Sequence, residues 1–170
     1  MAAKSPKGPQ PRSGCPVCVS LEQFGDRWSL LLIRDMMVRG YRTFGEFLNS
    51  GEGISTNILA SRLRSLQKAG VVSAERDEAD ARSIHYRLTE KGIALAPAML
   101  ELLLWAARWE QTAAPCGFVE HMEQNRAGVL AETRRRWAER DPTPILPPFK
   151  KPQTKTSTAS AQSTRRKKTR

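Results

Sequence analysis

The sequence predicts a mainly α-helical fold that contains one small β-hairpin and continues into additional helices after it. Apolar residues recur at helical spacing in several segments, and these segments are bounded by capping residues and glycines. Two short strand-like segments, 71–76 and 84–88, follow one another across a polar link. At 170 residues the chain can bury one hydrophobic core but is short for two full domains.

The chain is expected to divide into four parts, because its composition changes sharply near both ends. They are a disordered basic arm over 1–14, one domain over 15–110, a helical extension over 111–141 and a disordered basic tail over 142–170. The net charge of +11 resides in the arm and the tail, which contain no acid. The neutral middle therefore needs a local basic patch if it is to recognise a nucleic acid specifically.

The first four expected helices follow from capping residues. Cys15 and Pro16 open a short helix that runs to Phe24, and Asp26 caps an apolar core helix from Trp28 to about Val38. A capping box, Thr43-Phe44-Gly45-Glu46, predicts a short helix over 44–48. A fourth helix is capped by Ser55, continues to Ala69 and stops at Gly70, which suits a left-handed cap.

The remaining elements are a hairpin and two long helices. The strands span Val71–Arg76 and Ile84–Leu88. Thr89 caps a helix over about Glu90–Glu110, in which Pro97 should cause a kink or a restart. A further helix is expected over about Val119–Glu139. Helices, a hairpin and then a helix is the order of a winged helix-turn-helix, here with additional C-terminal helices.

The fourth helix has the polarity of a DNA-recognition helix. Leu59, Leu63 and Leu66 share one side, whereas the opposite side is polar and contains no acid. An ordinary solvated face is the alternative, but such faces usually include Glu, and the hairpin that follows favours DNA binding. The predicted DNA contacts are Arg42, Thr43, Ser55, Thr56, Asn57, Ser61, Arg62, Arg64, Ser65, Lys68 and, in the wing, Arg82.

No motif predicts catalysis. His85 and His121 are the only histidines, and there is no glycine-rich phosphate loop or nucleophile elbow. We expect no enzyme activity, no cofactor and no metal. No stretch approaches the roughly 20 consecutive apolar residues of a membrane span, and residues 1–14 lack the apolar run of a signal peptide, so a cytoplasmic protein without membrane contact is expected.

Residues 15–109 resemble the HxlR family of bacterial winged-helix regulators. Seven segments carry the resemblance in order: CPV (15–17), GDRWSLLLI (25–33), RTFGEFL (42–48), GIS (53–55), LASRLRSL (59–66), AGVV (69–72) and YRLTEKG (86–92). The chain departs from the family in a wing without the usual aromatic and proline residues, and in the long extension after Trp109. The implied function is a transcriptional regulator, typically a repressor, that binds double-stranded DNA.

The resemblance also implies a homodimer, formed mainly by the first helix and the long helix after the wing, that reads a pseudo-palindromic operator. The apolar surplus on the long helix agrees with this. The expected interface comprises Val17, Leu21, Leu100, Leu103, Leu104 and Trp105. A winged-helix module that binds proteins instead of specific DNA is the alternative, and salt-dependent duplex binding would discriminate the two.

The cysteines leave several readings open. Cys15, Cys18 and Cys116 could be small buried residues, or together with His121 they could form a zinc site. A thioredoxin-like role is disfavoured, because no strand precedes the Cys15-x-x-Cys18 motif. In some HxlR-like proteins the cysteine before this proline senses oxidants or electrophiles, so Cys15, with Cys18, is a candidate sensor and the effector would be an oxidant or a small molecule.

Overall fold

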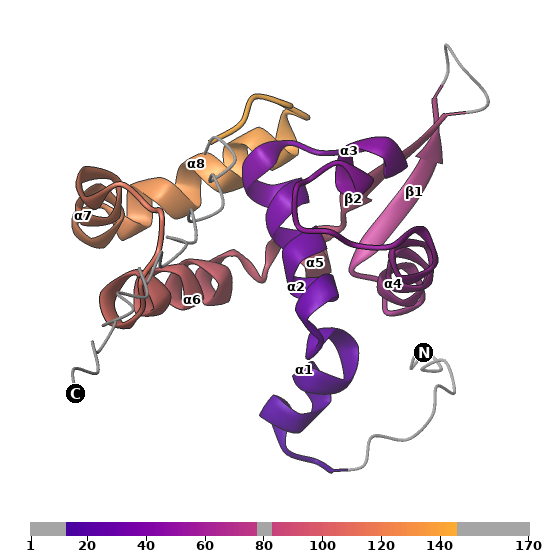
Figure 1. Ribbon diagram of the computed structural model, residues 1–170, viewed down its shortest axis with the longest axis horizontal. Helices are drawn as coiled ribbons and strands as arrows, with labels where there is room; N and C mark the ends of the chain where they lie inside the picture. Colours follow the sequence, from indigo (N-terminus) through magenta and orange to yellow (C-terminus); the bar gives the residue numbers. More distant parts are fainter. Residues whose placement is uncertain (1–12, 78–82, 146–170) are drawn as a thin grey trace, which may run out of the picture.

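The computed structural model describes residues 13–77 and 83–145 (Figure 1). The expected N-terminal arm and most of the expected tail, together with Arg82, lie outside these ranges. The described elements are α1 (Pro16–Phe24), α2 (Arg27–Arg34), the π-helical turn η1 (Asp35–Arg39), α3 (Phe44–Leu48), α4 (Thr56–Lys68), β1 (Val72–Arg76), β2 (Ile84–Leu88), α5 (Glu90–Ile93), α6 (Ala96–Trp109), α7 (Cys116–Gln124) and α8 (Arg126–Ala138).

The local signals for helix ends are confirmed. The Asp26 carboxylate accepts hydrogen bonds from the backbone N–H groups of Trp28 and Ser29, each at 3.0 Å. Thr43 and Glu46 form both halves of the capping box. Gly70 has φ +69°, the left-handed conformation that glycine adopts without steric cost. The mainly α-helical winged helix-turn-helix fold is therefore as predicted.

Three of the expected helices differ from the structure. The second ends its α-helical part at Arg34 and closes as η1, in which Asp35 and Arg39 are both buried and pair at 3.1 Å. The fifth restarts as α6, with Pro97 in its first turn, where the missing N–H costs nothing. The helix expected over 119–139 begins at Cys116 and breaks at Asn125, so that α7 and α8 can fold back on α6.

The main core lies between α2, η1, α3, α4, the hairpin and α5. Phe47 on α3 is fully buried at its centre, and its ring meets those of Tyr41 and Tyr86 edge-on, with centroids 6.3 and 6.2 Å away. The hairpin is antiparallel, with Val72 opposite Leu88 and Arg76 opposite Ile84. The core thus fixes α4 and the hairpin side by side, as Figure 1 shows.

A second, smaller core joins α6 to the C-terminal extension. Leu100 and Leu104 on α6 are only 6% and 2% exposed, and they pack with Met122 of α7 and with apolar residues of α8. The expectation that these two leucines form an intersubunit surface is therefore wrong: the extension buries them within the chain. Leu103 is half-buried at the edge of the same cluster.

The segment Glu90–Trp109 is long and apolar enough to cross a membrane by length and composition alone, with a mean hydropathy of 1.3. From the sequence we expected an apolar surplus on this segment but no membrane span. In the fold this segment comprises α5 and α6, which are separated by a turn, and one side of α6 is buried in the second core. The apolar residues of α6 are thus partly explained by packing inside the protein.

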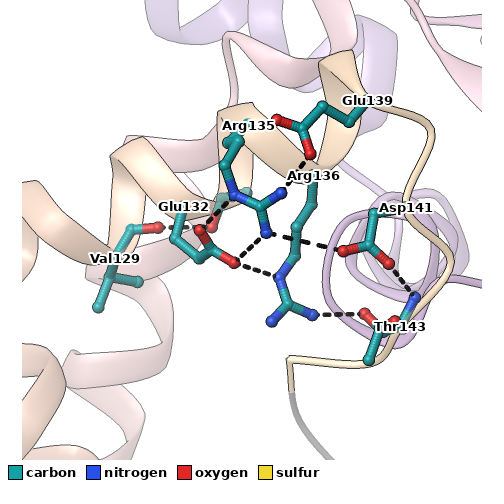
Figure 2. A network of polar contacts seen from close by, with 8 residues as sticks. Val129, Glu132, Arg135, Arg136, Glu139, Asp141 and Thr143 are labelled. Carbon is teal, nitrogen blue, oxygen red and sulfur yellow. Dashed lines mark hydrogen bonds and ion pairs between the residues drawn. The ribbon is translucent and has the colours of Figure 1, made fainter.

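Helix α8 links the extension to the winged domain. The Trp137 indole N–H donates to the carbonyl of Leu88 at 2.7 Å, and the backbone N–H of Ile145 donates to Val38 in η1 at 2.7 Å. Figure 2 shows the ion network that holds the end of α8: Glu132 lies between Arg135 and Arg136, and Arg136 donates to the carbonyl of Thr143. Residues 139–145 are thereby held against the winged domain.

Candidate nucleic-acid interface

The outer face of α4 has the arrangement expected of a recognition helix. Leu59, Leu63 and Leu66 are at most 1% exposed and anchor the helix in the core. On the opposite side the polar residues are all exposed, and none is acidic: Ser55, Thr56, Asn57, Ser61, Arg64, Ser65 and Lys68. Because a second helix joined by a tight turn can enter the major groove, this face can present base-reading side chains.

The cations on this face are available to a ligand. Arg64 donates its Nε–H to the carbonyl of Ala60 at 3.2 Å, and among the described residues neither Arg64 nor Lys68 has a carboxylate partner. Ile58, on the same side, is also exposed and could contact a thymine methyl group. An unpaired cationic face of this kind is suited to an anionic, groove-shaped partner.

Other residues predicted to bind DNA already have partners within the chain. Arg62 lies 3.4 Å from Asp26, so its guanidinium is ion-paired beside the start of α2. The Thr43 hydroxyl is used in the capping box. Arg42 turns inward and donates to the carbonyls of Met36 and Tyr41, both at 2.8 Å. Burial lowers the pKa of Arg42, and the neighbouring Arg87 lowers it further.

The wing is joined directly to the start of α3. Thr43 forms a β-bridge with His85, and the N–H of Tyr86 donates to the carbonyl of Arg42 at 2.7 Å. His85 in turn lies 3.4 Å from Asp77. Helix α3 and the hairpin therefore hold a fixed relation to each other beside α4.

The turn between α3 and α4 is anchored by a buried ion cluster. The Asp35 carboxylate forms ion pairs with Arg34 at 2.8 Å and with Arg39 at 3.1 Å. Arg34 also pairs with Glu52 in the turn, at 3.0 Å. Burial raises the pKa of Asp35, and the two arginines oppose this. The cluster connects η1 to the loop that sets the orientation of α4.

All three cysteines are exposed, which contradicts the alternative that they are small buried residues. Cys15 occupies the N-cap of α1. The pKa of its thiol is lowered, chiefly by the N–H groups of Cys18 and Val17 and then by the Cys18 thiol, although no hydrogen bond of ordinary cap geometry closes. Across residues 13–77 and 83–145, no three His, Cys, Asp or Glu side chains are grouped to hold a metal, so the zinc alternative gains no support there.

Apolar residues remain exposed on α1 and on one side of α6. Val17 and Leu21 are 64% and 57% exposed on α1. On α6, Leu102, Trp105 and Trp109 lie at helical spacing and are at least half exposed. Of the residues expected at an interface, Val17, Leu21 and Trp105 are thus at the surface, and Leu102 and Trp109, which the sequence reading omitted, accompany them.

The profile of the HxlR-like helix-turn-helix family matches residues 23–114, which is more than half of the chain. The chain belongs to the HxlR-like family. Among its relatives, the HTH-type regulator sll1512 of Synechocystis is 26% identical over 62% of this chain and 78% of its own length. YdeP of Bacillus subtilis is 30% identical over 57% of this chain and 75% of its own length.

Solved structures agree with this assignment. PA1607, described as a candidate transcription factor, is 38% identical over 61% of this chain and 71% of that chain, with a TM-score of 0.56. The redox regulator HypR in its oxidized form is 29% identical over 58% of this chain and all of that chain, with a TM-score of 0.52. As an HxlR-like protein, the chain is a helix-turn-helix, DNA-binding transcriptional regulator, and proteins of this class are not enzymes.

The family match ends at residue 114, so α7 and α8 lie beyond it. The sequence reading missed two exposed or half-exposed arginines, Arg87 on β2 and Arg140 after α8, that lie beside Arg42. The alternation of β2 indicates that Arg87 and His85 share a face. No sequence signal places Arg140 there, because its position depends on how α8 packs.

Proposed function

We propose that this chain is a homodimeric repressor that binds a pseudo-palindromic operator through α4, with Cys15 as the sensor of an oxidant or electrophile. The observation that carries the proposal is the acid-free, exposed face of α4. Asn57, Ser61 and Arg64 are side chains that can read base edges in the major groove. Repression follows if the bound dimer competes with RNA polymerase, and the protein would then act in the cytoplasm on the nucleoid.

The dimer is supported by the exposed apolar residues of α1 and α6. Five large side chains that each leave half or more of their surface in water are unusual unless a partner covers them. In a two-fold symmetric dimer the two copies of α4 are expected to face successive major grooves. The corrected interface set is Val17, Leu21, Leu102, Trp105 and Trp109.

The sensing role is supported by the lowered pKa of the exposed Cys15 thiol, since the thiolate is the reactive form. HypR, whose structure this chain resembles, is a redox regulator. Because Cys15 caps α1, a disulfide or adduct there would alter the helix that carries Val17 and Leu21. The spacing of the two copies of α4 would change with it.

The test begins with selection of preferred duplexes from a random pool, followed by affinity measurements on the selected site and on a scrambled one. Arg64→Ala should weaken binding to the selected site by about 1–3 kcal/mol if Arg64 reads a guanine, whereas Lys68→Ala should weaken both duplexes alike. Sedimentation at micromolar concentration should show a dimer. A monomer that selects no sequence would refute the proposal and favour a protein-interaction module.

Chemical modification of Cys15 is tested on the same complex. A mild electrophile should release wild-type protein from the selected duplex and leave Cys15→Ser bound. Cys116→Ser is the matched control, because Cys116 is also exposed and also lies at the start of a helix. Equal release of wild type and Cys15→Ser would remove Cys15 from the mechanism.

A further inference from the structure

A groove runs along the outer face of the wing and is lined by four arginines. They are Arg42 before α3, Arg76 at the end of β1, Arg87 on β2 and Arg140 after α8. This hollow of about 350 Å³ shares the lining residues Glu75, Arg87 and Arg140 with a second hollow of about 360 Å³, which is also lined by Trp137. We name it the arginine groove. Figure 1 shows α8 running from α7 toward the hairpin, and Arg140, which follows α8 in the chain, lines the groove.

Positive charge in the arginine groove exceeds the negative charge. Among the described residues, two carboxylates line the first hollow: Glu75, which lies 3.6 Å from Arg140, and Asp77, which lies 3.4 Å from His85. Arg42 and Arg87 donate to backbone carbonyls, Arg87 to that of Trp137 at 3.1 Å. Burial lowers the pKa of both arginines. In addition, Arg87 lowers the pKa of Arg42 and Arg140 lowers the pKa of Arg87, as expected where cations lie close together.

Arg140 occupies a position where its own backbone would favour another residue. It follows the last turn of α8 with φ +58°, and it is the only described residue other than glycine with a positive φ. Glycine is the usual residue at such a helix end, because a side chain there is sterically unfavourable. An arginine at this point is explained if its side chain has a use, and 69% of that side chain is open to solvent.

We infer that the arginine groove binds the phosphate backbone of the operator beside the wing. The inference rests on the proposed function and adds to it a contact from the C-terminal extension. Arg76 and Asp77 place one end of the groove where β1 ends, and the hairpin is the part of a winged helix that reaches the DNA backbone. A DNA strand that passes the hairpin and continues along the groove would meet Arg87 and Arg140. One Arg guanidinium can donate hydrogen bonds to two phosphate oxygens at once.

The experiment measures affinity against salt for the full chain and a duplex of about 30 base pairs, close to three helical turns. Arg140→Gly deletes the side chain at a backbone conformation that glycine favours, and Arg76→Ala deletes a second groove cation. Arg134→Ala is the matched control: it removes one charge from α8, but Arg134 pairs with Glu90 at 2.8 Å outside the groove. Each groove variant should flatten the plot of log affinity against log salt by about one unit, and the control should not.

The outcomes separate this inference from the proposed function. If Arg64→Ala weakens the selected site while Arg140→Gly and Arg76→Ala leave the salt slope unchanged, the arginine groove does not contact DNA, although the regulator does. An equal loss in Arg134→Ala would assign the effect to total charge and also overturn the inference. Binding of inorganic phosphate in the groove together with an unchanged DNA slope would identify a small-anion site instead.

Discussion

Replacing Leu104 with alanine tests whether the C-terminal extension is an integral part of the fold. Leu104 is 2% exposed, and together with Leu100 and Met122 it forms the buried part of the second core. Truncating a buried leucine to alanine typically lowers the free energy of unfolding by about 2–5 kcal/mol. The loss should lie near the lower end here, because a small cluster can partly collapse around the cavity. We expect a loss of about 2.5 kcal/mol, which in a chain of this length lowers the Tm by about 5–10 °C.

Trp105→Ala is the matched comparison, since Trp105 is the next residue but is 58% exposed. Its truncation should leave the stability of the monomer nearly unchanged and should weaken self-association instead. Denaturant unfolding followed by circular dichroism measures the first quantity, and sedimentation over a concentration series measures the second. A loss below about 1 kcal/mol for Leu104→Ala, with dimerisation impaired, would mean that Leu104 faces a partner subunit and that α7 and α8 do not pack as described.

Three further predictions concern charged and reactive groups. The pKa of Glu132 is lowered to about 2 by hydrogen bonds from two arginines. Its stabilisation of the end of α8 should therefore be complete above about pH 4.5 and be lost as the pH falls toward 2. An NMR titration of the carboxyl group measures this, and a midpoint near 4.5 would contradict it. Asp35→Ala leaves the buried Arg39 without its carboxylate partner at 3.1 Å, and should lower the free energy of unfolding by about 3 kcal/mol in denaturant experiments. A decrease of less than about 1 kcal/mol would show that the ion cluster does not stabilise the fold. Alkylation of Cys15 should reach half its maximal rate at a lower pH than alkylation of an ordinary exposed thiol. Mass spectrometry of the Cys18→Ser, Cys116→Ser protein measures this rate, and a midpoint at about pH 8.5 or above would contradict the lowered pKa.

Features set by neighbouring residues could be predicted from the sequence. The capping box at Thr43, the left-handed Gly70 and the recognition face of α4 each depend on side chains within one or two turns of the chain. The hairpin followed from two short β-prone segments across a polar link. These local signals, in their order along the chain, were sufficient for the fold and for the exposed, acid-free face of α4.

Features set by distant contacts could not be predicted. The apolar surplus of α6 was visible in the sequence, but whether Leu104 or Trp105 faces a partner depends on the return of α7 and α8, which the sequence reading joined into one helix. The break at Asn125 has no proline or glycine at the point where the helix ends. Likewise, nothing in the sequence indicates that Arg42 turns inward to two carbonyls, since the charge of a residue does not fix its direction.

The double attachment of α8 has a thermodynamic consequence. Because α8 packs on α6 through the second core and on β2 through the Trp137–Leu88 hydrogen bond, the wing would move together with a subunit contact formed by α6 in the proposed dimer. Any coupling between two such sites is reciprocal, so an oxidation that weakens operator binding tenfold obliges the operator to disfavour that oxidation tenfold. For a two-electron thiol couple this equals about 30 mV. Occupied promoters would therefore respond to oxidant later than free protein does, and the operator itself would help to set the threshold.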